Sequence, residues 1–199
     1  MPQYVKRYPK ALPASLCRRL IERFNLETNL KRDPQPLYST RKYFNISLGP
    51  NWRDLDTDVL RYSNQLMHRY FNKPGCVPSD VPDKWGNDGF VMACYSIGNI
   101  CTLHFDGQSG YPPHNNLRVA TQLFYLNDVE IGGETHFPLQ KLKIKPEEGK
   151  CIVFPVSFAY PHEVLKATVP RYVLQTWITD PDYFVFHSSL VDTSFKLKS

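Results

Sequence analysis

The strongest constraint on the fold is a change in sequence texture near residue 90. Between residues 90 and 180, short runs rich in Val, Ile, Tyr, Phe and Thr alternate with turn residues. These runs are FVMACYSI, RVATQLFYLN, KLKIK, KCIVFPV and RYVLQTWIT. Closely spaced short strands favour a barrel or a double-sheet jelly roll. We therefore expect a mostly-β protein whose core over residues 90–180 is a double-stranded β-helix of the jelly-roll or cupin type.

Residues 1–89 are expected to support this core with helices and loops. Apolar residues recur at helical spacing within residues 13–24 and again within residues 54–72, with charged residues between them. Residues 28–52 are polar and aromatic without firm periodicity, and the segment KPGCVPSDVPDKWGNDG reads as a loop. The two α-helices should therefore pack on one sheet of the β core.

Length and composition are those of one globular domain. The 199 residues suffice for one buried core, and no apolar run is long enough to cross a bilayer. The N-terminus lacks the apolar stretch of a secretory signal, and the five cysteines include no CxxC pair. We expect a single cytoplasmic domain over residues 1–199 with reduced thiols, residues 181–199 as a C-terminal tail, and no membrane partner.

The charge balance only weakly constrains the partners. The formal net charge is +5 and the isoelectric point is about 8.9, which would favour an acidic partner. The basic residues are scattered and form no long block. A nucleic-acid substrate is permitted by the charge and is not indicated by it.

The segment LHFDG carries the clearest chemical signal. In extended chain, His104 and Asp106 leave the same face of a strand, because side chains two residues apart point the same way. One imidazole and one carboxylate, joined by a second imidazole, make a facial triad that leaves three positions of an octahedral metal open. His162, in PHEV before another β-rich run, is the best candidate for the third ligand.

A second signal is an arginine at the start of the last β-rich run. Alternation along RYVLQTWIT places Arg171, Val173, Gln175 and Trp177 on one face. A guanidinium inside a barrel needs an anion, because burying its charge unpaired costs several kcal/mol. A dicarboxylate that reaches from the metal to Arg171 would supply that anion, whereas a surface pairing with Asp180 or Glu163 is the alternative.

Together these motifs resemble the prolyl 4-hydroxylase-like branch of the Fe(II)/2-oxoglutarate-dependent dioxygenases. That family shows a tyrosine-containing strand before H-x-D, then R-x-x-T-x-x-x-Y-L-N, a Gly-Gly turn before F-P, G-x-x-x-x-F, and H-E-V followed by a basic residue. The matching segments here, in the same order, are CYSIGNICTLHFD, RVATQLFYLND, GGETHFP, GKCIVF and PHEVLKATVPRYVLQTWI.

The resemblance implies a role for each matching residue. His104, Asp106 and His162 would bind Fe(II), and Arg171 would pair with the distal carboxylate of 2-oxoglutarate. Zn(II), Mn(II) or Co(II) would also fit the same three ligands. Tyr125 would hydrogen-bond 2-oxoglutarate, and Tyr95, on the strand before H-x-D, is a further candidate for this contact. Thr121 and Trp177 share faces with Tyr125 and Arg171 and are expected to line the pocket, with core packing as the alternative.

Two departures bear on this resemblance. Cys101 stands where many relatives carry a tyrosine three residues before the first iron histidine, so Tyr95 or Tyr125 would have to replace that contact with 2-oxoglutarate. The basic residue is Arg171, where collagen-type prolyl hydroxylases carry lysine. Asp106 is retained, unlike in halogenating relatives, so hydroxylation is the expected outcome.

The implied reaction is hydroxylation of an unactivated C–H bond, with 2-oxoglutarate and O2 converted to succinate and CO2 and with ascorbate as a candidate reductant. A prolyl or other residue in a protein or peptide is the leading substrate. A free amino acid or other small metabolite, a modified nucleic acid, and a noncatalytic module that binds a metal or a small acid are the alternatives.

Two segments are candidates for the substrate entrance by position alone. Residues 107–116 follow the metal-binding motif and contain Tyr111 and His114, and residues 37–45 contain Arg41 and Tyr43. Solvated loops and packing aromatics would explain these residues equally well.

Overall fold

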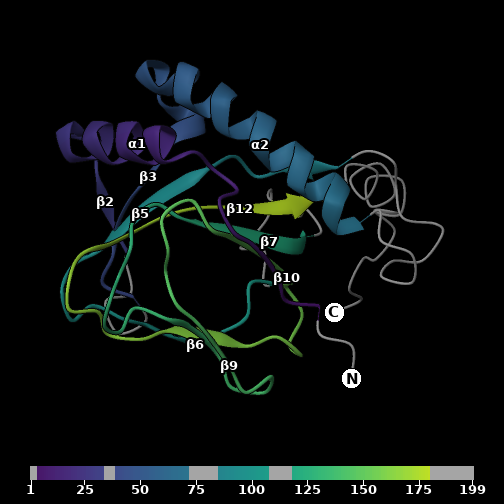
Figure 1. Ribbon diagram of the computed structural model, residues 1–199. Helices are drawn as coiled ribbons and strands as arrows, with labels where there is room; N and C mark the ends of the chain where they lie inside the picture. Colours follow the sequence, from purple (N-terminus) through teal and green to yellow (C-terminus); the bar gives the residue numbers. More distant parts are fainter. Residues whose placement is uncertain (1–3, 34–38, 72–84, 108–117, 180–199) are drawn as a thin grey trace, which may run out of the picture.

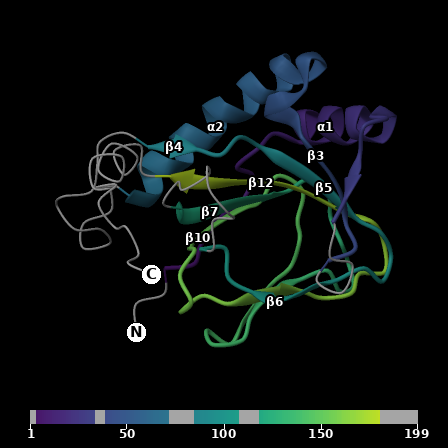
Figure 2. The ribbon, with the colours of Figure 1, turned by 180° about the vertical axis from the view of Figure 1, so that it is seen from behind.

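Two antiparallel sheets form the frame of the protein. The computed structural model describes residues 4–33, 39–71, 85–107 and 118–179. The larger sheet has the order β1-β10-β7-β12-β5-β3-β2, with β4 paired to β12, and the smaller has the order β6-β11-β8-β9. The two sheets face each other in Figures 1 and 2. This arrangement confirms the predicted jelly-roll core.

The larger sheet contains strands from both halves of the chain. Its members are β1 (Lys6–Tyr8), β2 (Lys31–Arg32), β3 (Lys42–Asn45), β4 (Gly86–Asn87), β5 (Val91–Tyr95), β7 (Arg118–Tyr125), β10 (Cys151–Pro155) and β12 (Arg171–Thr179). The smaller sheet consists of β6 (Cys101–His104), β8 (Thr135–Phe137), β9 (Leu142–Ile144) and β11 (His162–Val164).

The expectation that residues 1–89 supply only helices and loops is wrong, because β1 to β4 belong to the larger sheet. The strand β3 pairs with β5 along its whole length, from Lys42 opposite Cys94 to Asn45 opposite Val91. These N-terminal strands are two to four residues long, too short for a period to show in the sequence.

Both predicted helices form and cover the outer face of the larger sheet (Figures 1 and 2). They are α1 (Ala14–Leu26) and α2 (Arg53–Phe71), with short 3₁₀ turns at Ile46–Leu48 and Pro50–Trp52 before α2. No helix in the described part of the chain is both long and apolar enough to span a membrane.

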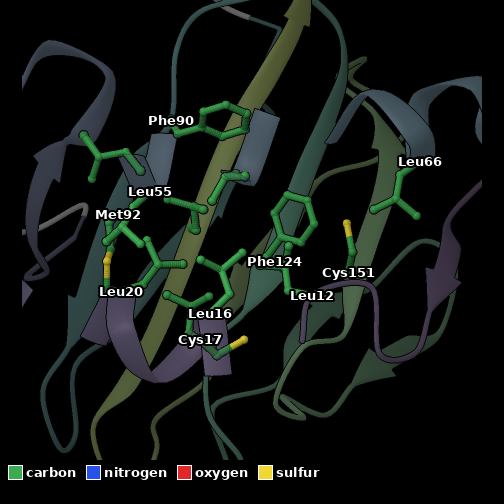
Figure 3. Packing of buried hydrophobic residues seen from close by; sticks show 14 of the residues in the cluster. Leu12, Leu16, Cys17, Leu20, Leu55, Leu66, Phe90, Met92, Phe124 and Cys151 are labelled. Atoms are coloured by element: carbon green, nitrogen blue, oxygen red, sulfur yellow. The ribbon is translucent and has the colours of Figure 1, made fainter. Parts of the chain in front are cut away.

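Side-chain alternation divides the apolar residues into two cores. One side of the larger sheet packs against the helices, where Phe124 and Cys151 lie in one cluster with Leu16 and Leu20 (Figure 3). The other side packs between the two sheets and contains Tyr95, Tyr125, Phe137, Phe154 and Val173. Because strand side chains alternate, neighbouring residues of β7 and β12 serve the helix core and the inter-sheet space in turn.

An ion-pair cluster joins the two helices on their outer side. Arg19 contacts Asp54 at 3.1 Å and Asp58 at 3.2 Å, and Arg23 donates to Asp54 at 3.0 Å. The hydrogen bond from Arg23 lowers the pKa of the Asp54 carboxyl from 3.8 to about 2. The Asp54 side chain is 50% exposed, so solvent screens much of this attraction.

Asp54→Asn is expected to lower the free energy of unfolding by less than about 1 kcal/mol at neutral pH. Because the pKa of Asp54 is depressed on folding, its contribution is present above pH 3.8 and is lost as the pH falls towards 2. Denaturant unfolding of wild type and variant across this range should show the difference disappearing in acid. Glu22→Gln, at an exposed α1 position without an ion pair among the described residues, is the control. A difference that persists at pH 2 would contradict the assignment.

Candidate metal centre and adjoining pocket

The three predicted metal ligands meet in the space between the sheets. His104 is the last residue of β6 and His162 is the first of β11, and the two are directly paired across these neighbouring strands. Asp106 lies in a turn beyond the end of β6, so the expectation that it extends from the same strand as His104 is wrong. The turn nevertheless brings its carboxylate to the histidines, and one ligand atom from each residue lies within 4.8 Å of the others.

Backbone contacts orient both imidazoles towards Asp106. His104 Nδ1 lies 2.7 Å from the carbonyl oxygen of Thr102, and His162 Nδ1 lies 3.3 Å from that of Tyr160. A carbonyl only accepts, so each Nδ1 donates its proton to the backbone, and Nε2 is the ring nitrogen that faces Asp106 and can bind a metal. The Nε2 atoms lie 3.4 Å and 3.7 Å from the Asp106 carboxylate, which also accepts a 2.6 Å hydrogen bond from Thr121. Contacts of this kind hold metal-binding side chains in place before the ion arrives.

The charges of the triad support a cation site. Burial opposes the charge on His104, but its hydrogen bonds to Asp106 and Cys101 outweigh this and raise its pKa to about 10. Burial likewise disfavours the charge on Asp106, yet the hydrogen bond from His104 and the nearby His162 hold its pKa below the usual range. Burial lowers the pKa of His162. Asp106 thus favours a proton on His104, and a metal ion bound there would displace that proton.

Arg171 is placed as the sequence predicts, inside the fold at the start of β12. Its side chain is 1% exposed and lies over the rings of Tyr95 and Tyr125, at 5.0 Å and 5.3 Å. Nη2 donates to Thr135 at 3.1 Å, and Nε is buried without a hydrogen-bond partner among the described residues. Within those residues Arg171 has no carboxylate partner, so the surface pairing with Glu163 does not occur.

A glycine turn and an asparagine hold the chain next to Arg171. Asn127 accepts a hydrogen bond from the Tyr172 backbone at 2.8 Å and donates to the Pro170 carbonyl at 3.0 Å. Gly132 has a positive φ of 77°, and a β-carbon there would lie 2.0 Å from the Lys166 carbonyl oxygen. Only glycine allows this close approach between the turn and the segment that leads into β12.

Gly132→Ala is therefore expected to lower the free energy of unfolding by about 2–4 kcal/mol. Gly98→Ala is a matched control, because Gly98 has nearly the same φ, 76°, but a β-carbon there meets nothing within 4 Å. Gly98→Ala should lower the free energy of unfolding by about 1 kcal/mol, through backbone strain alone. Denaturant unfolding measures both variants. Equal losses would mean that the contact with Lys166 is unimportant.

The triad and Arg171 share one cavity of about 510 Å³. Its walls come from both sheets and from the residue that precedes β3. Besides the triad and Arg171 it is lined by Arg41, Tyr95, Cys101, Leu103, Phe105, Arg118, Thr121, Leu123, Thr135, Phe154, Val164, Gln175 and Trp177.

The predicted cosubstrate residues occupy different positions around this cavity. Tyr95, Thr121 and Trp177 line it. Tyr125 does not line it: the residue is fully buried behind Arg171, and its hydroxyl donates to Thr135 at 2.7 Å. Trp177 Nε1 is buried without a hydrogen-bond partner among the described residues. The Tyr125 side chain thus supports Arg171 and Thr135.

The predicted entrance residues fall into two groups. Arg41 lines the cavity, whereas Tyr43 lies on β3 beside it, with the Arg41 guanidinium 5.7 Å from its ring. Tyr111 and His114 lie outside the described residues, so their predicted contact with substrate stays a prediction.

Arg118 is a cavity residue that the sequence reasoning missed. Its guanidinium stacks 3.8 Å from the centroid of the Trp177 ring and pairs with Asp88 at 2.9 Å. The sequence could have indicated it, because Arg118 is the first residue of RVATQLFYLN, the segment in which Thr121 and Tyr125 were predicted to contact the cosubstrate.

Comparison with known proteins agrees with this geometry. Residues 90–179 match the model of the 2OG-Fe(II) oxygenase superfamily, and this segment contains the triad and Arg171. Residues 90–179 are a 2OG-Fe(II) oxygenase domain. For this segment the predicted resemblance to the Fe(II)/2-oxoglutarate-dependent dioxygenases is thereby confirmed.

Relatives of this oxygenase domain include prolyl 4-hydroxylases. The chain is 29% identical over 127 residues to probable prolyl 4-hydroxylase 9 of Arabidopsis thaliana, a match that covers 51% of this chain and 44% of that protein. Arabidopsis prolyl 4-hydroxylase 13 is also 29% identical, over 48% of this chain and 44% of its own length. The chain thus spans less than half the length of these curated relatives.

Solved structures extend the likeness to nearly the whole fold. The viral collagen prolyl hydroxylase of Paramecium Bursaria Chlorella virus-1, solved with 2-oxoglutarate, has a TM-score of 0.66 and 22% identity over 89% of this chain and 96% of its own. A Trichoplax adhaerens prolyl hydroxylase, in complex with a hypoxia inducible factor peptide, has a TM-score of 0.72 and 17% identity over 92% and 87% of the two chains. At these identities the likeness establishes the fold.

The residues present fit Fe(II) and 2-oxoglutarate. Two imidazole nitrogens and a carboxylate converge, and Nδ1 of each histidine faces the backbone and not the other ligands. This is the donor set of the oxygenase facial triad. Within the described part of the chain, the buried Nε of Arg171 has no hydrogen-bond partner and its charge has no carboxylate partner, so an anion with a carboxylate end would suit this site. The cavity that joins them is the place for a dicarboxylate held at both ends.

Proposed function

We propose that the protein is an Fe(II)/2-oxoglutarate-dependent hydroxylase that acts on a prolyl or other residue of a protein or peptide. The observation that carries the proposal is one cavity with His104, Asp106 and His162 on one wall and, on another, a buried Arg171 that has no carboxylate partner among the described residues. The oxygenase domain and the prolyl 4-hydroxylase relatives support the same assignment.

Iron and 2-oxoglutarate, when bound, would supply the oxygen-activating chemistry, in which O2 and 2-oxoglutarate become succinate and CO2 as a C–H bond is hydroxylated. The protein's own residues orient and shield these groups. His104, Asp106 and His162 would hold Fe(II), Thr121 fixes the Asp106 carboxylate, and Arg171 would hold the distal carboxylate of 2-oxoglutarate.

The charge of the cavity favours an uncharged group at the reaction site. Arg118 is paired with Asp88 and Arg41 with Asp33, so these two guanidiniums are compensated by the protein itself. Among the described lining residues, the positive charge left unpaired is that of Arg171, and 2-oxoglutarate together with Asp106 would balance this charge and that of a bound Fe(II). A peptide proline, which carries no charge, suits the remaining space better than an ionised side chain.

Anaerobic addition of Fe(II) and 2-oxoglutarate to metal-free protein tests the first part of this proposal. The expected result is a visible charge-transfer band that requires both additions and saturates with 2-oxoglutarate. Folded protein that shows neither the band nor heat of 2-oxoglutarate binding in calorimetry would refute the oxygenase assignment.

Turnover tests the substrate class. Succinate release should rise when proline-containing peptides are added, and mass spectrometry should find one added oxygen on the peptide. Stimulation by free amino acids, with no response to any peptide, would instead assign the small-molecule hydroxylase alternative.

A further inference from the structure

Arg41 reaches the cavity from outside the oxygenase motifs. It lies directly before β3, and its side chain is 16% exposed. Nε pairs with Asp33 at 3.0 Å, and the Asp33 side chain is 14% exposed. This pairing compensates the charge of Arg41 within the protein, so Arg41 is not a free cation that waits for an anionic ligand.

The other end of the guanidinium contacts two polar residues of the cavity wall. Arg41 Nη1 donates to the Tyr95 hydroxyl oxygen and to Gln175 Oε1, each at 3.4 Å, and both are long hydrogen bonds. Tyr95 is 3% exposed and Gln175 is 8% exposed. Nη1 carries two protons, so a single nitrogen can serve both acceptors.

These contacts determine which atoms Tyr95 and Gln175 can offer to a ligand. An arginine only donates, so it must meet the lone pairs of Tyr95 and the carbonyl end of Gln175. The hydroxyl proton of Tyr95 and the amide protons of Gln175 are then available for other partners. Both residues line the cavity that also contains Arg171.

Strand pairing places these donors next to the proposed carboxylate site. Tyr95 is the cross-strand partner of Arg171, whose guanidinium lies 5.0 Å from the Tyr95 ring. Gln175 lies on the same face of β12 as Arg171, because it comes four positions later and side chains on a strand alternate between its two faces. Arg171, Tyr95 and Gln175 therefore present donors on one wall of the cavity.

We propose that Arg41 is a positioning residue for the cosubstrate, which holds Tyr95 and Gln175 with their protons directed at the oxygens of 2-oxoglutarate. This inference rests on the proposed function. It replaces the predicted substrate-binding role of Arg41. It also accounts for Cys101, because a thiol is a weak donor and the donors at this wall come from Tyr95 and Gln175 instead.

Anaerobic titration of Fe(II)-loaded protein with 2-oxoglutarate tests the inference through the charge-transfer band. Arg41→Ala should weaken 2-oxoglutarate binding about tenfold or more, as expected when donors to a charged ligand lose their orientation. Fe(II) affinity, measured separately, should be unchanged. Arg41→Lys should recover part of the loss, because an ammonium still only donates. Arg61→Ala, an exposed arginine paired with Asp58, is the matched control and should bind as wild type does.

A double-mutant cycle separates positioning from general damage. If Arg41 acts through Tyr95, then Arg41→Ala should have a smaller effect in a Tyr95→Phe background than in wild type. Equal effects in the two backgrounds, or an Arg41→Ala variant that loses Fe(II) and 2-oxoglutarate alike, would overturn the inference.

The same titration separates this inference from the proposed function. Wild-type protein that binds no 2-oxoglutarate would overturn both. Wild-type protein that binds it, together with an Arg41→Ala variant of equal affinity, would overturn the role of Arg41 and leave the proposed function standing.

Discussion

Replacing Asp106 with asparagine is expected to weaken Fe(II) binding by more than about a hundredfold and to abolish the charge-transfer band with 2-oxoglutarate. Loss of a residue that only orients a metal ligand typically costs 10- to 100-fold in affinity, and loss of the ligand's charge should cost more. Asp106 is the only carboxylate in the described triad, and its side chain is 10% exposed. It would compensate the charge of a bound metal in a site that water screens little. Calorimetric titration with Fe(II) under anaerobic conditions measures the loss.

Glu163→Gln provides the matched control. Glu163 is the neighbour of His162 in the chain, but its side chain pairs with His136 at 2.7 Å and does not line the cavity. This variant should retain both Fe(II) binding and the band. An Asp106→Asn variant that binds Fe(II) as tightly as wild type would exclude Asp106 as a ligand.

Arg171→Met is expected to reduce 2-oxoglutarate affinity at least about a hundredfold while leaving Fe(II) binding intact. A guanidinium can hold a carboxylate with two charge-assisted hydrogen bonds, and methionine fills similar space without any donor. Arg171 is buried without a carboxylate partner among the described residues, and its Nε has no hydrogen bond there. Removing this charge should therefore leave the melting temperature unchanged or raise it.

Thermal unfolding of Fe(II)-loaded protein measures both the change in melting temperature and the loss of 2-oxoglutarate binding. Wild type should gain stability as 2-oxoglutarate rises, because a ligand that binds only the folded state stabilises it. Arg171→Met should show no such gain at the same concentrations. Arg171→Lys, which keeps the charge but loses the planar fork, should show an intermediate gain. A full 2-oxoglutarate response in Arg171→Met would place the carboxylate elsewhere.

The sequence predicted the β core and both helices because these segments are long enough for their hydrophobic repeat to be recognised. Alternation along β12 correctly placed Arg171, Gln175 and Trp177 on the cavity face. The four N-terminal strands were missed because each is two to four residues long and is defined by its partner strand. Asp106 was placed on a strand because the alternation of LHFD was followed beyond the end of the strand at His104, although the Asp106-Gly107 pair is a turn signal.

By itself the sequence determined the types of chemical group in the site, their order along the chain and the faces they occupy within one strand. These are local properties, set by residue identity and by the two-residue repeat of extended chain. Only the tertiary structure decided which groups meet: His104 with His162, Arg171 with Tyr95, and Arg41 with Gln175. These contacts depend on which strands pair and in what register, and long-range packing sets both.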